Sequence, residues 1–234
     1  MNAADHLAGL EPYGELGFEA ARLEAFFESL ADADWERPSR CEGWSTRDML
    51  AHLASAEGYH HACLDDELDA FVQRYVDAGG TDIGSFNEIG IREYDDKAPP
   101  EILRTWRAAS AETRRRMRER DGGTMTTMVP DYPVRQQAFH VASELATHAD
   151  DIGVPVSPDE EARRTAWRAP FSRFVLAEES RDVVVEPHDG EHVVRAGGVE
   201  ARLSDHDFVE AVAGRLPPGH ALPDALRAAL STAV

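Results

Sequence analysis

Glu144 and His148 lie four residues apart in the segment QQAFHVASELATHADD, residues 136–151, whose apolar residues predict a buried helix. Four residues make about one turn of an α-helix, so both side chains project from the same face. Carboxylates and imidazoles are common ligands of divalent cations such as zinc. The pair therefore predicts half of a metal site, although solvated helices also carry such pairs as weak side-chain contacts.

His52 is the best candidate for a third ligand. It lies in WSTRDMLAHLASAEGYHH, residues 44–61, in the middle of a second predicted helix and beside apolar residues. Two histidines and one carboxylate would leave one coordination position open, which is typical of catalytic rather than structural zinc. The alternative is that His52 is a hydrogen-bonded core residue. His140, one turn before Glu144, is the reserve ligand if Glu144 does not bind the metal.

Four long helices are predicted to position these side chains. Apolar residues recur in them at three- and four-residue intervals, as in amphipathic helices. Their approximate ranges are 5–30, 45–76, 100–120 and 136–151, with a shorter helix near 86–94. Ser45 and Asp48 form a variant of the capping box at the start of the second helix. Asp48 could instead orient His52, but capping alone explains it. His60 is expected to be turned partly away from the interior, and His61 to lie on the surface.

The character of the chain changes after Gly153. Residues 154–164, VPVSPDEEARR, predict an acidic linker that contains proline, and the first domain is expected to end near Pro158. Residues 169–180 predict a helix, although a strand is not excluded. DVVVEP and HVVRAG flank a His-Asp-Gly turn and predict a β-hairpin, to which VEARLS could add a strand. Two further helices follow, the first over residues 205–216. The predicted fold class is therefore α+β, with an N-terminal helical bundle over residues 1–157 and a small α/β domain over residues 158–234.

Composition excludes several classes of protein. The 234 residues include 44 acidic and 24 basic side chains, and a formal charge of −20 would repel nucleic-acid backbones. No signal peptide and no membrane span are expected, so we predict a cytoplasmic protein, with a monomer as the default. Cys41 and Cys63 form no metal-binding or redox motif, and we expect neither thiol to be a catalytic nucleophile.

Two segments resemble the mycothiol-dependent maleylpyruvate isomerase family, whose N-terminal domain is a DinB-like metal-binding four-helix bundle. PSRCEGWSTRDMLAHL, residues 38–53, is similar to the family's loop, tryptophan and metal-histidine helix. ELATHADDIG, residues 144–153, is similar to its second metal segment. The resemblance implies that His52, Glu144 and His148 bind the metal.

A third, less specific similarity lies near the C-terminus. The predicted strands and the helix that ends in Ala213-Gly214-Arg215 resemble the family's C-terminal domain, in which Gly-Arg commonly closes the penultimate helix. This implies a catalytic, substrate-binding role for Arg215. The segment HDFVEAVAGRL is more charged than the family's apolar helix, however, and a cation favoured by the helix dipole is an alternative explanation of Arg215.

The resemblance also implies zinc and mycothiol, the latter as a thiol cosubstrate that is added to an electrophilic, anionic small molecule. In a cis-trans isomerase of the maleylpyruvate type, the thiol adds to a conjugated double bond and is eliminated after rotation, whereas in a mycothiol S-transferase it stays in the product. Arg215, Arg202 or the cluster Arg114–Arg120 could bind a substrate carboxylate, although the cluster is also explained as a solvated face. A metal-dependent hydrolase on the same bundle and a non-catalytic metal-binding or interaction module remain as alternatives.

Overall fold

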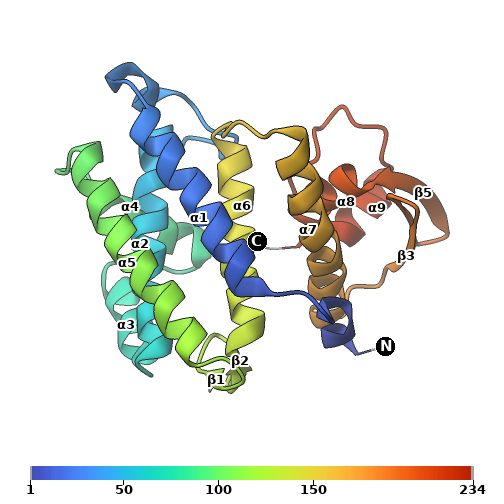
Figure 1. Ribbon diagram of the computed structural model, residues 1–234, viewed down its shortest axis with the longest axis horizontal. Coiled ribbons are helices and arrows are strands. Elements are labelled where there is room, and N and C mark those ends of the chain that lie inside the picture. The colour runs from blue at the N-terminus through green and yellow to red at the C-terminus, as the bar shows by residue number, and fades with distance from the viewer. Residues whose placement is uncertain (1, 233–234) are drawn as a thin grey trace. The chain divides into compact units, whose positions relative to one another are not determined.

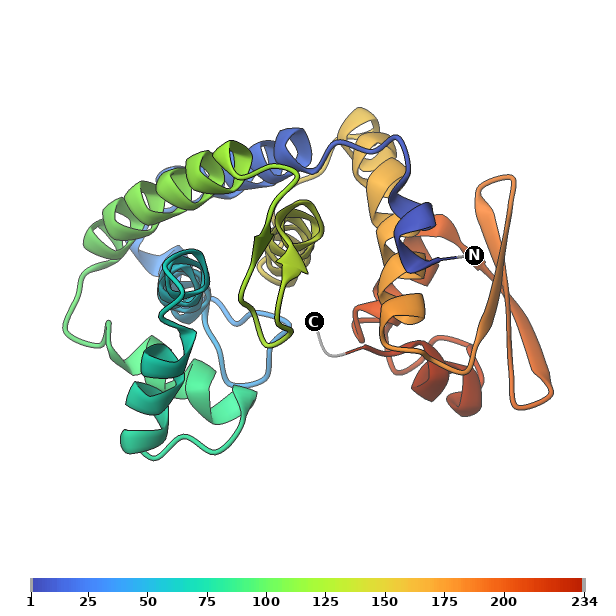
Figure 2. The same ribbon diagram turned by 90° about the horizontal axis from the view of Figure 1, so that it is seen from below.

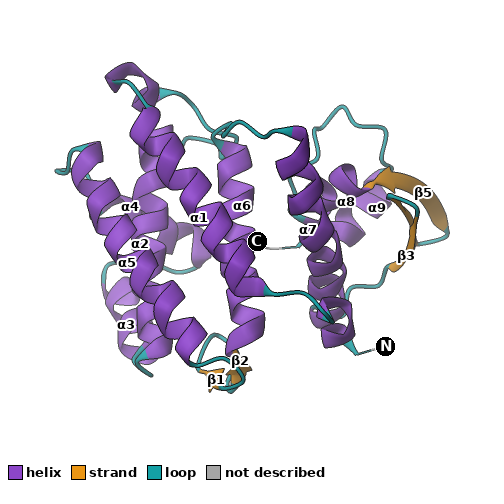
Figure 3. Ribbon diagram, viewed as in Figure 1, coloured by secondary structure: helices purple, strands orange, loops and turns teal. Residues whose placement is uncertain are grey.

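The computed structural model of the chain describes residues 2–232, which form two compact units. Of the described residues, 12–154 make up one, called here the helical unit, and 2–11 with 155–232 make up the other, called the C-terminal unit. The predicted α+β fold class is confirmed, because long helices dominate and the strands form small antiparallel sheets (Figure 3). The division into domains 1–157 and 158–234 stays a prediction.

The helical unit is built on four long helices (Figure 1), namely α1 (Pro12–Ser29), α2 (Thr46–Leu64), α5 (Pro99–Glu119) and α6 (Val134–Asp151). α1 packs on α6, α2 packs on α5, and α1 also contacts α5. Figure 2 views α2 and α6 nearly end-on, so their axes run in similar directions. Large apolar side chains fill the space between the helices, among them Leu16, Leu23, Phe27, Met49, Leu53, Trp106, Met117, Phe139 and Leu145.

The predicted start of α2 is confirmed, but its predicted end near Val76 is wrong. The Ser45 side chain accepts a hydrogen bond from the Asp48 backbone amide, and the Asp48 carboxylate accepts one from the Ser45 amide at 2.9 Å. The helix then ends at Leu64, because Asp66 adopts a left-handed conformation (φ 57°) that an α-helix cannot continue through. Two short helices follow, α3 (Leu68–Asp77) and α4 (Ile83–Arg92).

The first helix also differs from its predicted range of 5–30. A separate 3-10 helix, η1 (Ala3–Leu7), precedes α1 and belongs to the C-terminal unit. Gly9 has a φ of 77°, which interrupts the helix. Pro12 then begins α1, at a position where its missing amide hydrogen is not needed. A β-bridge of two short strands, β1 (Thr124–Met125) and β2 (Tyr132–Pro133), lies before α6.

The C-terminal unit contains a three-stranded antiparallel sheet in the order β3 (Val184–His188), β4 (Glu191–Ala196) and β5 (Val199–Ser204). The hairpin turn is at Asp189 and Gly190, both with positive φ, as a tight two-residue turn requires. Helices α7 (Pro158–Glu178), α8 (Asp205–Val212) and α9 (Asp224–Leu230) complete the unit. Its core includes Leu176, Val194, Leu203, Phe208, Leu226 and Leu230.

The predicted linker after Gly153 is only partly correct, because α7 already begins at Pro158. Ser157 caps this helix by accepting from the Glu160 amide, and the Glu160 carboxylate accepts from the Ser157 amide at 2.8 Å. Ser-x-x-Glu followed by proline at the first helical position signals the start of a helix. The prediction of a linker did not take this signal into account. In the part of the chain that the structure describes, no helix is both long and apolar enough to cross a membrane.

Packing in the helical unit predicts that Leu23→Ala is strongly destabilising. Leu23 is completely buried in α1, so truncation removes apolar contacts and leaves a cavity that should cost about 2–5 kcal/mol of unfolding free energy. Val76→Ala is the control, since Val76 is 47% exposed and its truncation should change stability by less than about 0.5 kcal/mol. Urea denaturation followed by circular dichroism measures both. Equal effects of the two substitutions would contradict the packing of α1.

Candidate metal centre

His52 on α2 and the pair Glu144 and His148 on α6 converge in the helical unit. His52 Nε2 lies 3.5 Å from Glu144 Oε1, and the imidazoles of His52 and His148 meet edge to face with centroids 4.9 Å apart. One potential ligand atom from each of the three residues lies within 4.8 Å of the others. We call these residues the His-Glu-His group. Among residues 2–232, no fourth histidine, cysteine or acidic residue joins it.

The surroundings of His52 show why it faces the interior. It lies three residues after Met49, which is fully buried, and only 7% of His52 itself is exposed. The indole of Trp44 lies against its ring at a centroid distance of 5.0 Å. Trp44 Nε1 in turn donates a hydrogen bond to Glu88 Oε1 of α4 at 2.8 Å. The loop before α2 and helix α4 thus restrict the position of the His52 ring.

The protonation states of His52 and Glu144 suit metal binding. Burial lowers the pKa of His52 and outweighs the opposing contact with Glu144, so the imidazole is neutral at neutral pH. Burial opposes the ionisation of Glu144, but the contacts with His52 and His60 hold the pKa of this carboxyl well below its usual range. A neutral imidazole and an ionised carboxylate are the forms that bind a metal ion.

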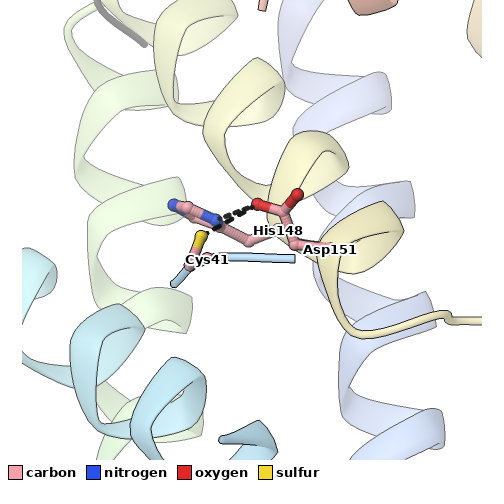
Figure 4. Close-up of side chains that lie close together, drawn as sticks. All are labelled: Cys41, His148 and Asp151. Atoms are coloured by element: carbon pink, nitrogen blue, oxygen red, sulfur yellow. Dashed lines mark hydrogen bonds and ion pairs between the residues drawn. The ribbon is translucent and has the colours of Figure 1, made fainter. Parts of the chain in front are cut away.

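His148 is held at its other ring nitrogen by a buried carboxylate. His148 Nδ1 lies 3.1 Å from Asp151 Oδ2, and Cys41 Sγ donates to the same oxygen at 3.3 Å. Figure 4 shows the sulfur of Cys41 beside the nitrogen that contacts Asp151. Because Nδ1 is engaged, Nε2 is the atom that His148 can offer to the His-Glu-His group. Carboxylates fix the tautomer and orientation of metal-binding histidines in this way.

Cys41, His148 and Asp151 form a second group with the same potential ligand spacing. It shares His148 with the first group, and the hydrogen bonds to Asp151 explain its geometry without a metal. It also differs from a Cys-His-Asp nucleophile, in which thiol and carboxylate contact different nitrogens of the imidazole. We therefore interpret Asp151 and Cys41 as residues that orient His148. Neither residue is expected here from the sequence, although Asp151 follows His148 by three residues, about one helical turn.

Two other histidines of the helical unit bear on the site. The sequence predicts that His60 is turned partly away from the interior, and this is wrong, because it is only 5% exposed and its Nε2 lies 3.6 Å from Glu144 Oε2. His140, the reserve ligand, belongs to neither group among the described residues, and its Nε2 lies 2.9 Å from the Tyr132 hydroxyl. Asp48 caps α2, as favoured from the sequence.

Arg215 and the basic cluster lie in different parts of the fold. Arg215 follows α8 in the C-terminal unit and donates from Nη1 to the Ala213 carbonyl at 3.4 Å. Its role in catalysis stays a prediction. In the cluster on α5, Arg115 pairs with Glu112 and Glu119 of the same helix, and Arg116 pairs with a carboxylate near the end of α2. These ion pairs favour a solvated face for the cluster. Arg202 pairs with Glu191 across two strands.

The donor set of the His-Glu-His group fits a divalent transition metal. Two imidazoles and one carboxylate are a recurrent set for catalytic zinc, and they carry one negative charge in total. The group thus offers one candidate ligand atom from each of three side chains, close enough to one another to hold a metal ion.

Comparison with protein families gives one match. A family model described as the mycothiol maleylpyruvate isomerase N-terminal domain matches residues 16–153, more than half of the chain. The matched residues include both segments that hold the candidate ligands His52, Glu144 and His148. Neither the curated proteins nor the solved structures gave a match.

Substitutions distinguish the two groups that share His148. We expect His52→Ala and Glu144→Ala each to abolish binding of one zinc ion, because both remove a ligand of the His-Glu-His group. His148→Ala should do the same. Cys41→Ser should keep the zinc, because Cys41 is assigned an orienting contact. Zinc content is measured by mass spectrometry after dialysis. Zinc lost in Cys41→Ser but retained in His52→Ala would place the metal in the second group instead.

A pH dependence of metal affinity follows from the environment of His148. Burial lowers the pKa of His148, but the contacts with Asp151, Cys41 and Glu144 outweigh burial and raise it to about 9. Below this pH the metal must displace one proton, so the apparent affinity for Co²⁺ should rise about tenfold per pH unit from neutral pH to about pH 9. Calorimetry in buffers of different ionisation enthalpy measures both affinity and released protons.

Asp151→Asn provides the control for this pH dependence. Asparagine keeps the shape of the side chain but removes the negative charge that raises the pKa of His148. The Co²⁺ affinity of the variant should therefore level off at a lower pH than that of the unmodified protein. An affinity that is independent of pH in the unmodified protein, or an affinity that levels off at the same pH in Asp151→Asn, would contradict the assignment.

Proposed function

The chain belongs to the mycothiol maleylpyruvate isomerase N-terminal domain family, and on this basis we propose a zinc- and mycothiol-dependent enzyme that acts on an electrophilic, anionic small molecule. The observation that carries the proposal is the convergence of His52, Glu144 and His148 within the residues that the family model matches. The reaction favoured by the family is cis-trans isomerisation of the maleylpyruvate type.

The three residues of the group have distinct parts in binding zinc. His52 offers a neutral imidazole that burial keeps unprotonated, and Glu144 offers the negative charge. His148 completes the set through Nε2 while Asp151 holds Nδ1. A zinc ion bound by this set would act as a Lewis acid that favours the thiolate form of a bound thiol. The chain itself therefore needs no nucleophilic cysteine.

Recognition of an anionic substrate requires a local positive group, because the chain as a whole is strongly acidic. We assign this task to Arg215, whose guanidinium can bind a carboxylate with two hydrogen bonds. The support is its position directly after α8, where the sequence resembles the family's Gly-Arg. The paired arginines of α5 are less suitable, since carboxylates of the chain already neutralise them.

Separate measurements of thiol and substrate test the proposed function. With zinc, mycothiol and maleylpyruvate, we expect the trans product to form while the concentration of free thiol stays constant, and no turnover without thiol. Glu144→Ala should be inactive, and Arg215→Met should retain thiol dependence with a raised KM for the anionic substrate. Liquid chromatography of the product and a colorimetric thiol assay give the two readouts.

The other outcomes assign other reactions. Loss of one thiol for each product formed would indicate a mycothiol S-transferase, in which addition to the electrophile is not reversed. Turnover that does not depend on thiol would remove both possibilities and favour a metal-dependent hydrolase. Stoichiometric zinc without activity on any thiol acceptor would favour a non-catalytic metal-binding module.

A further inference from the structure

The Glu144 carboxylate lies between two histidines of α2. His52 Nε2 is 3.5 Å from Oε1, and His60 Nε2 is 3.6 Å from Oε2. His52 and His60 are eight residues apart, slightly more than two helical turns, so they approach the carboxylate from two positions along the axis of α2. Each carboxylate oxygen therefore faces one imidazole, but only His52 belongs to the His-Glu-His group.

We propose that His60 is a positioning residue that holds the second oxygen of Glu144, so that the first oxygen stays directed at His52 and His148. The last torsion angle of a glutamate side chain is only weakly restricted, so a free carboxylate can rotate and exchange its oxygens. A hydrogen-bond donor at Oε2 removes this freedom. The inference rests on the proposed metal-dependent function, because it concerns how one ligand of that metal is held.

The His60 ring packs against the Tyr59 ring at a centroid distance of 5.6 Å, and its Nε2 makes a polar contact with Glu144. The side chain is 5% exposed, and within the described residues its buried Nδ1 has no hydrogen-bond partner. Glu57, one turn earlier on α2, is also buried, but its carboxylate accepts a hydrogen bond from the Thr113 hydroxyl of α5. A hydrogen on Nε2 can thus point to Glu144 whether Nδ1 carries a proton or not.

His61 provides a matched control on the next position of the same helix. It is half-buried, and its Nε2 lies 3.2 Å from the backbone carbonyl of Ala109 on α5. No contact links it to the His-Glu-His group among the interactions of the described residues. Substitution of His60 and of His61 therefore compares two neighbouring histidines of which only one contacts the site.

The experiment measures Co²⁺ binding to metal-free protein by affinity and by the visible spectrum of the bound ion. His60→Gln places an amide nitrogen near the position of Nε2. His60→Asn is shorter, so its amide nitrogen lies near the position of Nδ1 and cannot reach Glu144. We expect His60→Asn to weaken Co²⁺ binding by about 10–100-fold and to change the spectrum. His60→Gln should restore most of the affinity, and His61→Gln should leave both readouts unchanged.

Two results would overturn the inference while leaving the metal site intact. Co²⁺ affinity and spectrum unchanged in His60→Asn would show that Glu144 needs no support from His60. Complete loss of the metal in both His60 variants, as expected for His52→Ala, would make His60 a ligand instead. If the unmodified protein binds no Co²⁺, the proposed function and this inference fail together, which distinguishes that case from the other two.

Thermal denaturation of the metal-free variants separates positioning from folding. Both His60 variants bury an amide and should lose similar stability, so stability alone cannot account for a difference between them in Co²⁺ affinity. If His60→Asn does not fold, His60→Met fills much of the volume of the ring without a donor, and the same loss of affinity is expected. Affinity equal to that of the unmodified protein in His60→Met would then overturn the inference.

Discussion

An ionised carboxylate in the interior of a helical bundle is the constraint on which this fold and its site depend. Glu144 lies on α6 with only one quarter of its side chain exposed, and a buried charge is costly unless partners compensate it. His52 and His60 of α2 supply these partners. The contacts that compensate the charge of Glu144 therefore also set the distance between its oxygens and the imidazoles. The proposed metal site depends on this distance.

His148 extends this constraint to the loop before α2. Its Nδ1 contacts Asp151, and the backbone carbonyl of Asp151 accepts a hydrogen bond from the Arg40 amide at 2.9 Å. The same loop places Cys41 against the Asp151 carboxylate and Trp44 against the His52 ring. One short segment thus restricts both histidines of the group, although it contributes none of the three ligands. Fixing ligands through a second layer of contacts is common in metal sites.

Helical periodicity is sufficient to predict the main helices of the bundle and to place Glu144 and His148 on one face, because one face of each helix must be apolar, whereas the choice of His52 as the third residue also needs the family resemblance. Periodicity is not sufficient for His60. Eight residues at about 100° each place His60 about 80° around α2 from His52, so the pattern predicts different directions. Both histidines nevertheless contact the same residue, because the long Glu144 side chain reaches between the two imidazoles. Asp151 was missed for another reason, since its contact with Cys41 joins residues 110 positions apart.

The charged side chains of the helical unit are largely engaged within the unit itself. At neutral pH the raised pKa of His148 keeps its imidazole protonated, which offsets the charge of Glu144, and Asp151 at the end of α6 adds a second carboxylate. In the helical unit, Arg47 donates to the carbonyls of Tyr94 and Lys97, and the arginines of α5 discussed above pair with carboxylates. These arginines are therefore already engaged by carbonyl or carboxylate oxygens of the chain. A cation bound by the His-Glu-His group would replace the proton on His148 and supply positive charge next to Glu144 and Asp151, which is the physical reason to expect metal binding and the ionisation of His148 to be coupled.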